Sequence, residues 1–189
     1  METEFKSMPE IKRTTNRLVL VAATVDHLRA ELVSPERLGI LLGTEVPQGW
    51  PPGEYDEGAQ KFFLERLSLG GSDVVGWYGW YALLHRGSQD TGPLIASGGF
   101  LGPPNEVGEV EIGYSVHQDW QGNGYATELV GELVKYAFED IRTRRIVAHT
   151  TRQNPASCRV LEHLGFCDSG CRSEALTIQY ELIRGYVRA

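Results

Sequence analysis

The chain has 189 residues, of which 41% are hydrophobic, so it is long enough to form one well-packed domain. Its formal net charge of -7 at pH 7 argues against a general binder of nucleic acid or of anionic membranes, because such proteins usually carry a basic surface. No apolar run approaches the roughly 20 residues that a membrane helix requires. Any anion must therefore be held by a local site.

Residues 1–14 are polar and of mixed charge, and we expect them to be a flexible lead before a single domain over residues 15–189. They lack the cationic start and apolar core of a secretion signal. Cys158, Cys167 and Cys171 are odd in number and have no Cys-x-x-Cys spacing, so we expect reduced thiols and a cytoplasmic protein. The five histidines show no zinc-ligand spacing, and no metal site is predicted.

The first third of the chain predicts one strand followed by helices. Residues 17–22 form an apolar strand pattern, and Thr24 is placed to cap a short helix that runs through Val33. A second helix opens at Ser34 and Pro35. Further along lie a proline-containing loop at residues 43–53 and an amphipathic helix at residues 55–67.

The middle of the chain predicts two strands. Residues 74–85 are dense in aromatic side chains on both faces, which is typical of a central strand covered on both sides. Residues 86–93 form the turn after it, and residues 94–100 form the next strand. Gly98 and Gly99 in that strand indicate a bulge or a close approach of another backbone.

Residues 109–126 carry the strongest local signal. Apolar residues alternate with polar or small ones along residues 109–116, which predicts a strand with one polar face. Gly122 and Gly124 follow, and apolar residues then recur at helical spacing over residues 126–141. The N–H groups at a helix start have no partner within the helix, so a turn that exposes them attracts a phosphate. A plain tight turn is the alternative interpretation of the two glycines.

The last third predicts a strand at residues 144–150, a helix from Pro155 to Leu164 that Gly165 ends, and a closing strand at residues 174–183. No internal repeat or linker interrupts the series. The order of elements is that of a mixed α/β domain.

Two motifs in this order resemble the GNAT family of N-acetyltransferases. Residues 121–126, Gln-Gly-Asn-Gly-Tyr-Ala, match the family's Gln/Arg-x-x-Gly-x-Gly/Ala loop. Residues 154–157, Asn-Pro-Ala-Ser, with Leu-Gly-Phe at residues 164–166, look like its Asn-x-x-Ser/Ala segment that ends in Gly-Phe. Ser157 is similar to the serine of the RimJ/RimL branch, which acetylates the N-termini of ribosomal proteins. Leu161 stands where other members carry a tyrosine, and His163 stands where a Lys or Arg is usual.

The resemblance implies an α/β fold with a mixed, mostly antiparallel twisted sheet, helices on both faces and a splayed pair of strands that holds acetyl-coenzyme A. Pantetheine is expected to bond to the freed strand edge, where the Val116 N–H is also expected to meet the thioester oxygen. Asn154 is either a ligand of pantetheine or only a helix cap. The coenzyme-binding residues that the resemblance implies are Ser115, Val116, Gln121, Gly122, Asn123, Gly124, Tyr125, Ala126 and Asn154.

Glu111 and Ser157 are the candidate catalytic residues. Attack on a thioester needs a neutral amine, and Glu111 projects from the polar strand face as the candidate base. The resemblance implies that the Ser157 hydroxyl protonates the departing coenzyme A thiolate. The alternatives are that Glu109 and Glu111 form only a solvated strand face, and that Ser157 only bonds nearby backbone. Of the two glutamates, Glu109 is the one expected to take no part in catalysis.

The expected reaction is acetyl transfer to a primary amine, in a peptide N-terminus or a small molecule, by a monomer or a homodimer. A non-catalytic acyl-coenzyme A sensor on the same fold is an alternative, since fold does not settle activity. A dinucleotide-binding domain is another, although Thr127 stands where its third glycine or alanine belongs. Trp50 is either a wall of the acceptor pocket or a core residue, and Arg142, Arg144 and Arg145 either reach the coenzyme's 3′-phosphate or complement a helix end.

Overall fold

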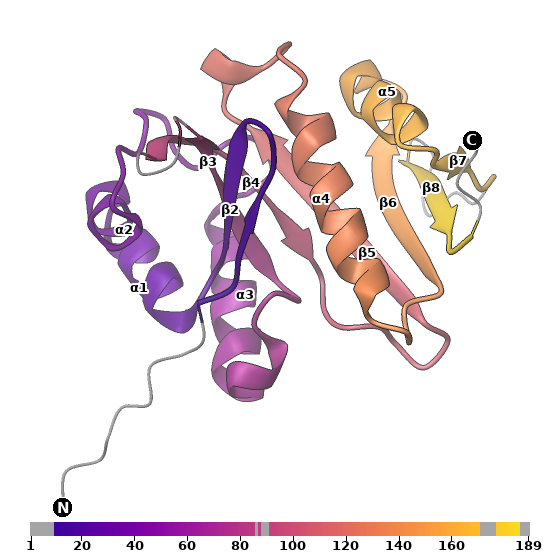
Figure 1. The fold of residues 1–189 in the computed structure, drawn as a ribbon, viewed down its shortest axis with the longest axis horizontal. Coiled ribbons are helices and arrows are strands. Elements are labelled where there is room, and N and C mark those ends of the chain that lie inside the picture. The colour runs from indigo at the N-terminus through magenta and orange to yellow at the C-terminus, as the bar shows by residue number, and fades with distance from the viewer. Residues whose placement is uncertain (1–9, 86, 88–90, 171–176, 186–189) are drawn as a thin grey trace, which may run out of the picture.

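The computed structural model describes residues 10–85, 87, 91–170 and 177–185. In this part of the chain the strands form one sheet in the order β1-β2-β3-β4-β5-β6-β8-β7, and every neighbouring pair is antiparallel except β5 and β6. Figure 1 shows the helices arranged around it. The strands are β1 (Lys12–Thr14), β2 (Leu18–Ala22), β3 (Gly79–His85), β4 (Thr91–Phe100), β5 (Glu109–Val116), β6 (Arg145–Thr151), β7 (Cys167–Asp168) and β8 (Thr177–Ile183). The helices are α1 (Val25–Val33), α2 (Pro35–Leu42), α3 (Glu57–Gly70), α4 (Tyr125–Glu139) and α5 (Pro155–His163), with short 3-10 turns η1 (Gly71–Val74) and η2 (Gln118–Trp120).

Helices cover both faces of this sheet. On one face, Phe63 of α3 packs over Gly79 of β3. On the other, Leu129 and Leu133 of α4 pack over Gly98 of β4. The predicted α/β fold with a mostly antiparallel sheet is therefore confirmed. The dinucleotide-binding interpretation is wrong, because that fold needs a mostly parallel sheet.

The two parallel strands pair only where they begin. The β5–β6 register runs from Glu109 opposite Arg145 to Glu111 opposite Val147. Beyond that point β5 stays paired with β4 and β6 stays paired with β8 as far as Thr151. Each strand keeps its outer neighbour, so the two inner edges diverge. This confirms the predicted splayed pair.

The aromatic strand β3 lies between β2 and β4 with its first five residues buried, as predicted, but it begins later than residue 74. Residues 71–74 form η1 instead, and Gly76 adopts a φ of 90°, which ends any extended run. At Gly99, φ is 151° and a Cβ would collide with the carbonyl oxygen of Tyr78. The predicted close approach of another backbone is therefore confirmed.

The N-terminal boundary differs from the prediction, and part of the C-terminal one cannot be compared. Residues 1–9 of the predicted lead lie outside the described residues, but β1 pairs with β2, so the sheet already begins within that lead. At the other end, residues 171–176 lie outside the described residues, with Cys171 and the predicted start of the closing strand among them. Among the helices described, none combines the length and the apolar character needed to cross a membrane.

Candidate functional site

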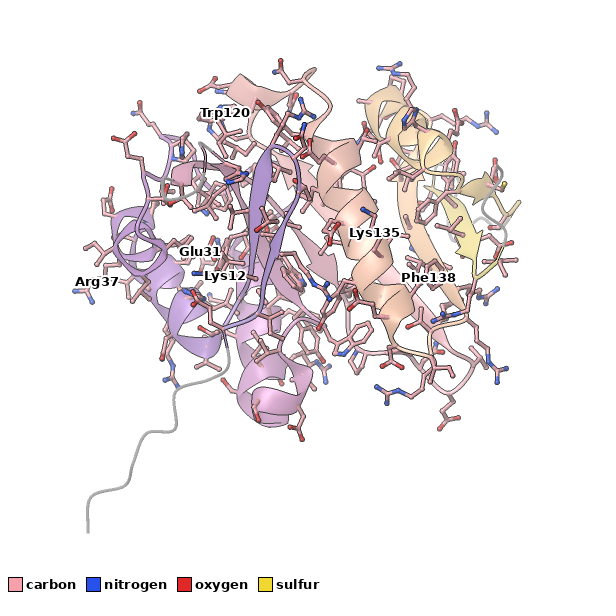
Figure 2. The ribbon with its side chains drawn as sticks, in the orientation of Figure 1. Lys12, Glu31, Arg37, Trp120, Lys135 and Phe138 are labelled. Carbon is pink, nitrogen blue, oxygen red and sulfur yellow. The ribbon has the colours of Figure 1, made fainter. Side chains whose placement is uncertain are left out.

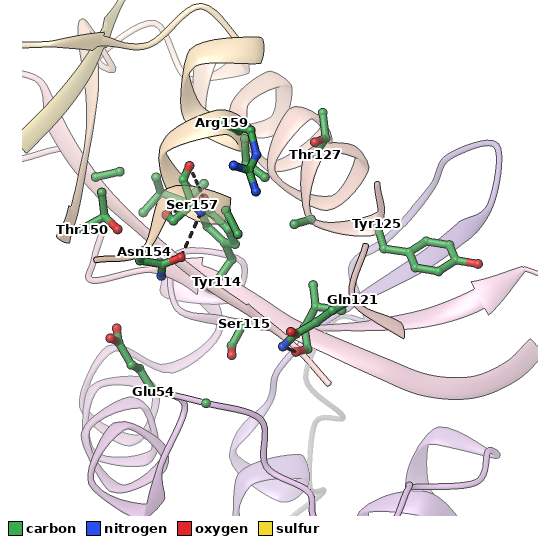
Figure 3. A pocket seen from close by; sticks show the side chains of 18 of the residues that line it. Glu54, Tyr114, Ser115, Gln121, Tyr125, Thr127, Thr150, Asn154, Ser157 and Arg159 are labelled. Carbon is green, nitrogen blue, oxygen red and sulfur yellow. Dashed lines mark hydrogen bonds between the residues drawn. The ribbon is translucent and has the colours of Figure 1, made fainter. Parts of the chain in front are cut away.

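A cavity of about 930 Å³ opens between the diverging strands. Its walls come from β5, β6, the first turns of α4 and α5, and the Gly53–Glu54 segment of the loop before α3 (Figure 3). Elements far apart in the sequence therefore meet at one place. The predicted coenzyme-binding residues all line the cavity except Asn123: they are Ser115, Val116, Gln121, Gly122, Gly124, Tyr125, Ala126 and Asn154.

The glycine turn leaves the start of α4 open. Gly124 is the N-cap residue, with a left-handed φ of 78° and no side-chain cap hydrogen bond, and Gly122 has a φ of 77°. A Cβ on Gly122 would meet nothing within 4 Å, so its backbone conformation selects glycine and crowding does not. Asn123 shapes the turn instead of lining the cavity, because its Nδ2 donates to the carbonyls of Trp120 and Gln121 at 3.2 and 2.9 Å.

Arg17 and Glu128 clamp this turn to the start of β2. Glu128 accepts hydrogen bonds from the Thr15 hydroxyl at 2.6 Å, the Arg17 N–H at 2.7 Å and Arg17 Nε at 2.6 Å. Arg17 also donates to the Asn123 carbonyl at 2.9 Å and stacks over the Tyr125 ring. Burial alone would raise the pKa of Glu128, but the hydrogen bonds from Thr15 and Arg17 outweigh it and lower that pKa.

We predict that Glu128→Gln lowers the free energy of unfolding by about 1 kcal/mol at neutral pH. The folded-state pKa lies below the unfolded value of roughly 4.3, so this stabilisation is present above that value and is lost as pH falls through the folded pKa. Denaturant unfolding of both proteins between pH 7 and pH 3.5 measures the difference. A gap that stays constant across this range would contradict the ionic clamp.

The free edge of β5 presents backbone groups to the cavity. The His117 N–H donates to the Ile95 carbonyl of β4, and Leu101 donates to the Glu111 carbonyl. Because backbone groups alternate between the two edges of a strand, those of Tyr114 and Val116 point toward the gap and those of Ser115 point to β4. Gln121 Nε2 donates a hydrogen bond to the Val116 carbonyl at 2.9 Å. The Val116 N–H points toward the cavity and can bond to a ligand there.

Ser157 and Tyr114 meet across the cavity from α5 and β5. Their hydroxyl oxygens lie 2.9 Å apart and share a hydrogen bond (Figure 3). Burial raises the pKa of the Tyr114 hydroxyl, and the Ser157 hydrogen bond lowers it in part. Sequence reasoning missed Tyr114, because strand alternation placed it among the apolar residues. Leu161, at the position where other members carry a tyrosine, is fully buried.

Asn154 performs the capping role that was one of its two predicted roles. Its Oδ1 accepts a hydrogen bond from the Ser157 N–H at 3.1 Å, and Pro155 follows at the first helical position. The residue also lines the cavity. The cap holds the first turn of α5 in place and with it the Ser157 hydroxyl.

Glu111 does not line the cavity. Its Oε1 lies 2.8 Å from Nδ1 of His149, and His149 does line it. Glu109 lies further from the gap and forms an ion pair with Arg145 at 2.5 Å. Glu54 is a lining carboxylate that sequence reasoning missed, because it lies in a loop without hydrophobic periodicity.

A buried carboxylate holds the loop that carries Glu54. Glu31 of α1 is 5% exposed, and its carboxylate contacts Tyr81 of β3 (Figure 2 labels Glu31). It accepts hydrogen bonds from Trp50 Nε1 at 2.6 Å, the Tyr55 hydroxyl at 2.7 Å and the Tyr81 hydroxyl at 2.6 Å. Burial raises the pKa of Glu31, although these hydrogen bonds act against the rise. Trp50 is therefore a core residue and not a wall of the cavity.

The arginine side chains near the end of α4 form ion pairs within the protein. Arg142 pairs with Asp140 at 2.6 Å, and Arg145 pairs with Glu109, at the opposite end of α4 from the glycine turn. Arg159 and His163 of α5 line the cavity instead. Within the described ranges, no cluster of three or more His, Cys, Asp or Glu side chains is arranged to hold a metal ion.

Comparison with known proteins gives the family. Residues 17–167 match the model of the acetyltransferase (GNAT) domain. The chain is 30% identical over 152 residues to "Uncharacterized N-acetyltransferase YjdG" of Bacillus subtilis, which covers 80% of this chain and 87% of that protein.

Solved structures share the fold. The ribosomal-protein-S5-alanine acetyltransferase of Vibrio fischeri has a TM-score of 0.64 at 15% identity, covering 95% of this chain and 100% of that one. The structure titled RimL, a ribosomal L7/L12 alpha-N-protein acetyltransferase, has a TM-score of 0.61 at 20% identity, covering 96% and 98%. The domain match and the relative that is similar over most of its length establish that this chain belongs to the GNAT family and is an N-acetyltransferase.

Proposed function

We propose that this enzyme transfers the acetyl group of acetyl-coenzyme A to a primary amine by direct attack in a ternary complex. The observation that carries the proposal is the single cavity that joins the open start of α4 to the diverging edges of β5 and β6. We further propose that the chain from β1 onward, and not only from residue 15, acts as one acetyltransferase domain. The free thiols of Cys158 and Cys167 favour a reducing compartment, the cytoplasm.

The start of α4 fits a pyrophosphate. The left-handed Gly124 cap leaves the first helical N–H groups to an external acceptor, and the helix dipole makes that end positive. Arg159 and His163 add cationic or hydrogen-bonding groups on the α5 side. The free N–H of Val116 suits the amide chain or the thioester oxygen of the bound molecule. When bound, the molecule supplies the activated acetyl group.

The Ser157–Tyr114 pair suits the departing thiolate. A hydroxyl held by a second hydroxyl 2.9 Å away is fixed in direction and can donate its proton as the carbon–sulfur bond breaks. Tyr114 then positions Ser157 and offers a route for its reprotonation.

The acceptor side of the cavity is acidic. Glu54 lines it. The Glu111 carboxylate does not reach the cavity itself but contacts His149, which does. A carboxylate attracts an ammonium group, which favours a cationic acceptor such as a peptide N-terminus or a small amine. An α-amine titrates near pH 8 and a lysine side chain near 10.4, so an α-amine is the acceptor more easily made neutral.

We predict that Gly122→Ala raises the Kd for acetyl-coenzyme A by about 10-fold. An alanine in the left-handed region costs roughly 1–2 kcal/mol, which the turn can relieve by moving its N–H groups away from the phosphate. Calorimetric titration measures the change. The matched control is Gly170→Ala, because Gly170 has a similar φ of 74°, open space around a Cβ and no place in the cavity wall. Equal affinities in the two variants would contradict the phosphate site.

Mass spectrometry of acceptors tests the function itself. The wild-type protein is incubated with acetyl-coenzyme A and a panel of N-terminal peptides, lysine peptides, polyamines and amino-sugars. The proposal predicts that at least one amine class gains an acetyl group. Coenzyme binding without transfer to any member would instead favour the sensor alternative.

A further inference from the structure

Glu111 and His149 form a pair beside the cavity, near the point where β5 and β6 diverge. Glu111 lies in the last β5–β6 rung, opposite Val147, and His149 lies two residues further along β6. Residues two apart in a strand share a face, so both side chains project to the same side of the sheet. His149 Nδ1 and Glu111 Oε1 are 2.8 Å apart. The imidazole is the member of the pair that reaches the cavity wall.

This contact fixes the chemistry of the imidazole. A carboxylate only accepts hydrogen bonds, so a neutral His149 carries its proton on Nδ1 and keeps a lone pair on Nε2. Nε2 is the ring nitrogen that Glu111 does not occupy. The same carboxylate stabilises the imidazolium that forms when Nε2 takes a proton. The pair therefore has the parts of a general base with an orienting acid.

The pair lies on the side of the sheet from which an acceptor would approach. Ser115 shares the face of Glu111, and a Cβ on Gly53 would collide with the Ser115 hydroxyl, so the Gly53–Glu54 loop covers this face. Tyr114 projects to the opposite face and meets Ser157 there. This arrangement places a base on one face of the sheet and a proton donor on the other. It suits a reaction in which the amine attacks from one side of the thioester carbonyl and the thiolate departs on the other.

The pair is also within reach of a ligand anchored at α4. The β5 segment from Val116 to Ile112 is roughly 13 Å long, at about 3.3 Å per residue. A chain that is held by its phosphates at the glycine turn and laid along this edge ends beside His149.

Building on the proposed function, we propose that His149 is the general base of the reaction and that Glu111 positions it. His149 Nε2 takes one proton from the acceptor ammonium and later passes it to water. The nitrogen lone pair then forms the carbon–nitrogen bond while the carbon–sulfur bond breaks. The nitrogen then releases its second proton to water while Ser157 gives its own proton to the thiolate. Ser157 regains a proton from water through Tyr114, so the net products are an amide, a thiol and one proton.

The other charged groups near His149 either form ion pairs of their own or line the cavity from other elements. Arg145, on the same face, is held by Glu109 at 2.5 Å and Glu181 at 3.4 Å. The β8 residue opposite His149 is the uncharged Gln179. Glu54 lines the same cavity from the loop, and Arg159 and His163 line it from α5. Glu111 is the partner in direct contact, so its removal tests the pair specifically.

Rates against pH test the assignment. Wild-type kcat/KM should show an acid limb, because protonation of the base removes the lone pair that accepts the proton. His149→Gln should lower kcat about 100-fold, keep the Kd for acetyl-coenzyme A and lose this acid limb. Added imidazole should restore part of the rate of His149→Ala. The control, His85→Gln at the end of β3 and outside the cavity wall, should behave as wild type.

The ring's proton position gives a readout that needs no coenzyme. In long-range ¹H–¹⁵N spectra of the free protein, neutral His149 should be the Nδ1–H tautomer, and Glu111→Leu, which removes the acceptor, should shift it toward Nε2–H. If wild type is active but His149→Gln keeps its rate and acid limb, the base assignment is wrong and the proposed function stands. If wild type acetylates no amine, the proposed function fails and the base assignment fails with it.

Discussion

Replacing Ser157 with alanine is expected to lower kcat about 100- to 1,000-fold while leaving the Kd for acetyl-coenzyme A nearly unchanged. General acid catalysis contributes roughly 10²–10⁴ to a rate, and the variant removes the hydroxyl that we propose as the proton donor to the thiolate. The change removes only the side-chain oxygen of Ser157. The Asn154 cap stays intact, because it uses the Ser157 backbone N–H. Steady-state thiol release and calorimetric titration measure the two quantities.

Tyr114→Phe is the matched variant for this experiment. It keeps the ring on β5 and removes only the hydroxyl that lies 2.9 Å from Ser157 Oγ. If Tyr114 positions Ser157, the loss should be smaller, about 10-fold in kcat, and should add little to the Ser157→Ala defect. Ser157→Ala activity within about 3-fold of wild type would refute the assignment of Ser157 as the proton donor.

Glu31→Ala is expected to lower the free energy of unfolding by roughly 3–5 kcal/mol, more than the loss predicted for Glu128→Gln. The carboxylate accepts hydrogen bonds from Trp50, Tyr55 and Tyr81, and all three donors are buried. Its removal takes away the acceptor that these three buried donors share. Denaturant unfolding followed by tryptophan fluorescence measures the loss.

Two further variants keep this prediction informative. Glu31→Gln retains one acceptor oxygen and should lose less than the alanine variant, so it remains measurable if alanine prevents folding. Glu65→Ala, on the exposed side of α3, removes a helical glutamate without buried partners and should change stability by less than about 0.5 kcal/mol. Equal losses at Glu31 and Glu65 would show that the buried hydrogen bonds are not responsible.

The parts of the fold that follow from local pattern were predictable. Strand alternation before two glycines and helical spacing after them located β5, the glycine turn and α4 within one or two residues, apart from the last turn of α4. Thr24 and Ser34 were readable as caps because the N-cap preference depends only on neighbouring residues. β1 was not readable, because three polar residues carry no strand signal until β2 pairs with them.

The contacts that define the site's chemistry join residues far apart in the sequence. His149 and Glu111 are 38 residues apart, and Tyr114 and Ser157 are 43 residues apart. Neither pair has a local pattern, because each depends on the register of β5 with β6 or on the docking of α5. The sequence could nominate Glu111 as a carboxylate on a polar face. Only the three-dimensional arrangement reveals that His149 lies between it and the cavity.

Calorimetric titration of acetyl-coenzyme A into the purified protein, followed in the same sample by thiol release with the amine panel, tests the account most directly. We expect saturable binding at one site per chain and thiol release with one class of amine. An absence of binding at millimolar coenzyme would contradict the assignment of the α4 start as a phosphate site, and with it the mechanism built on that cavity.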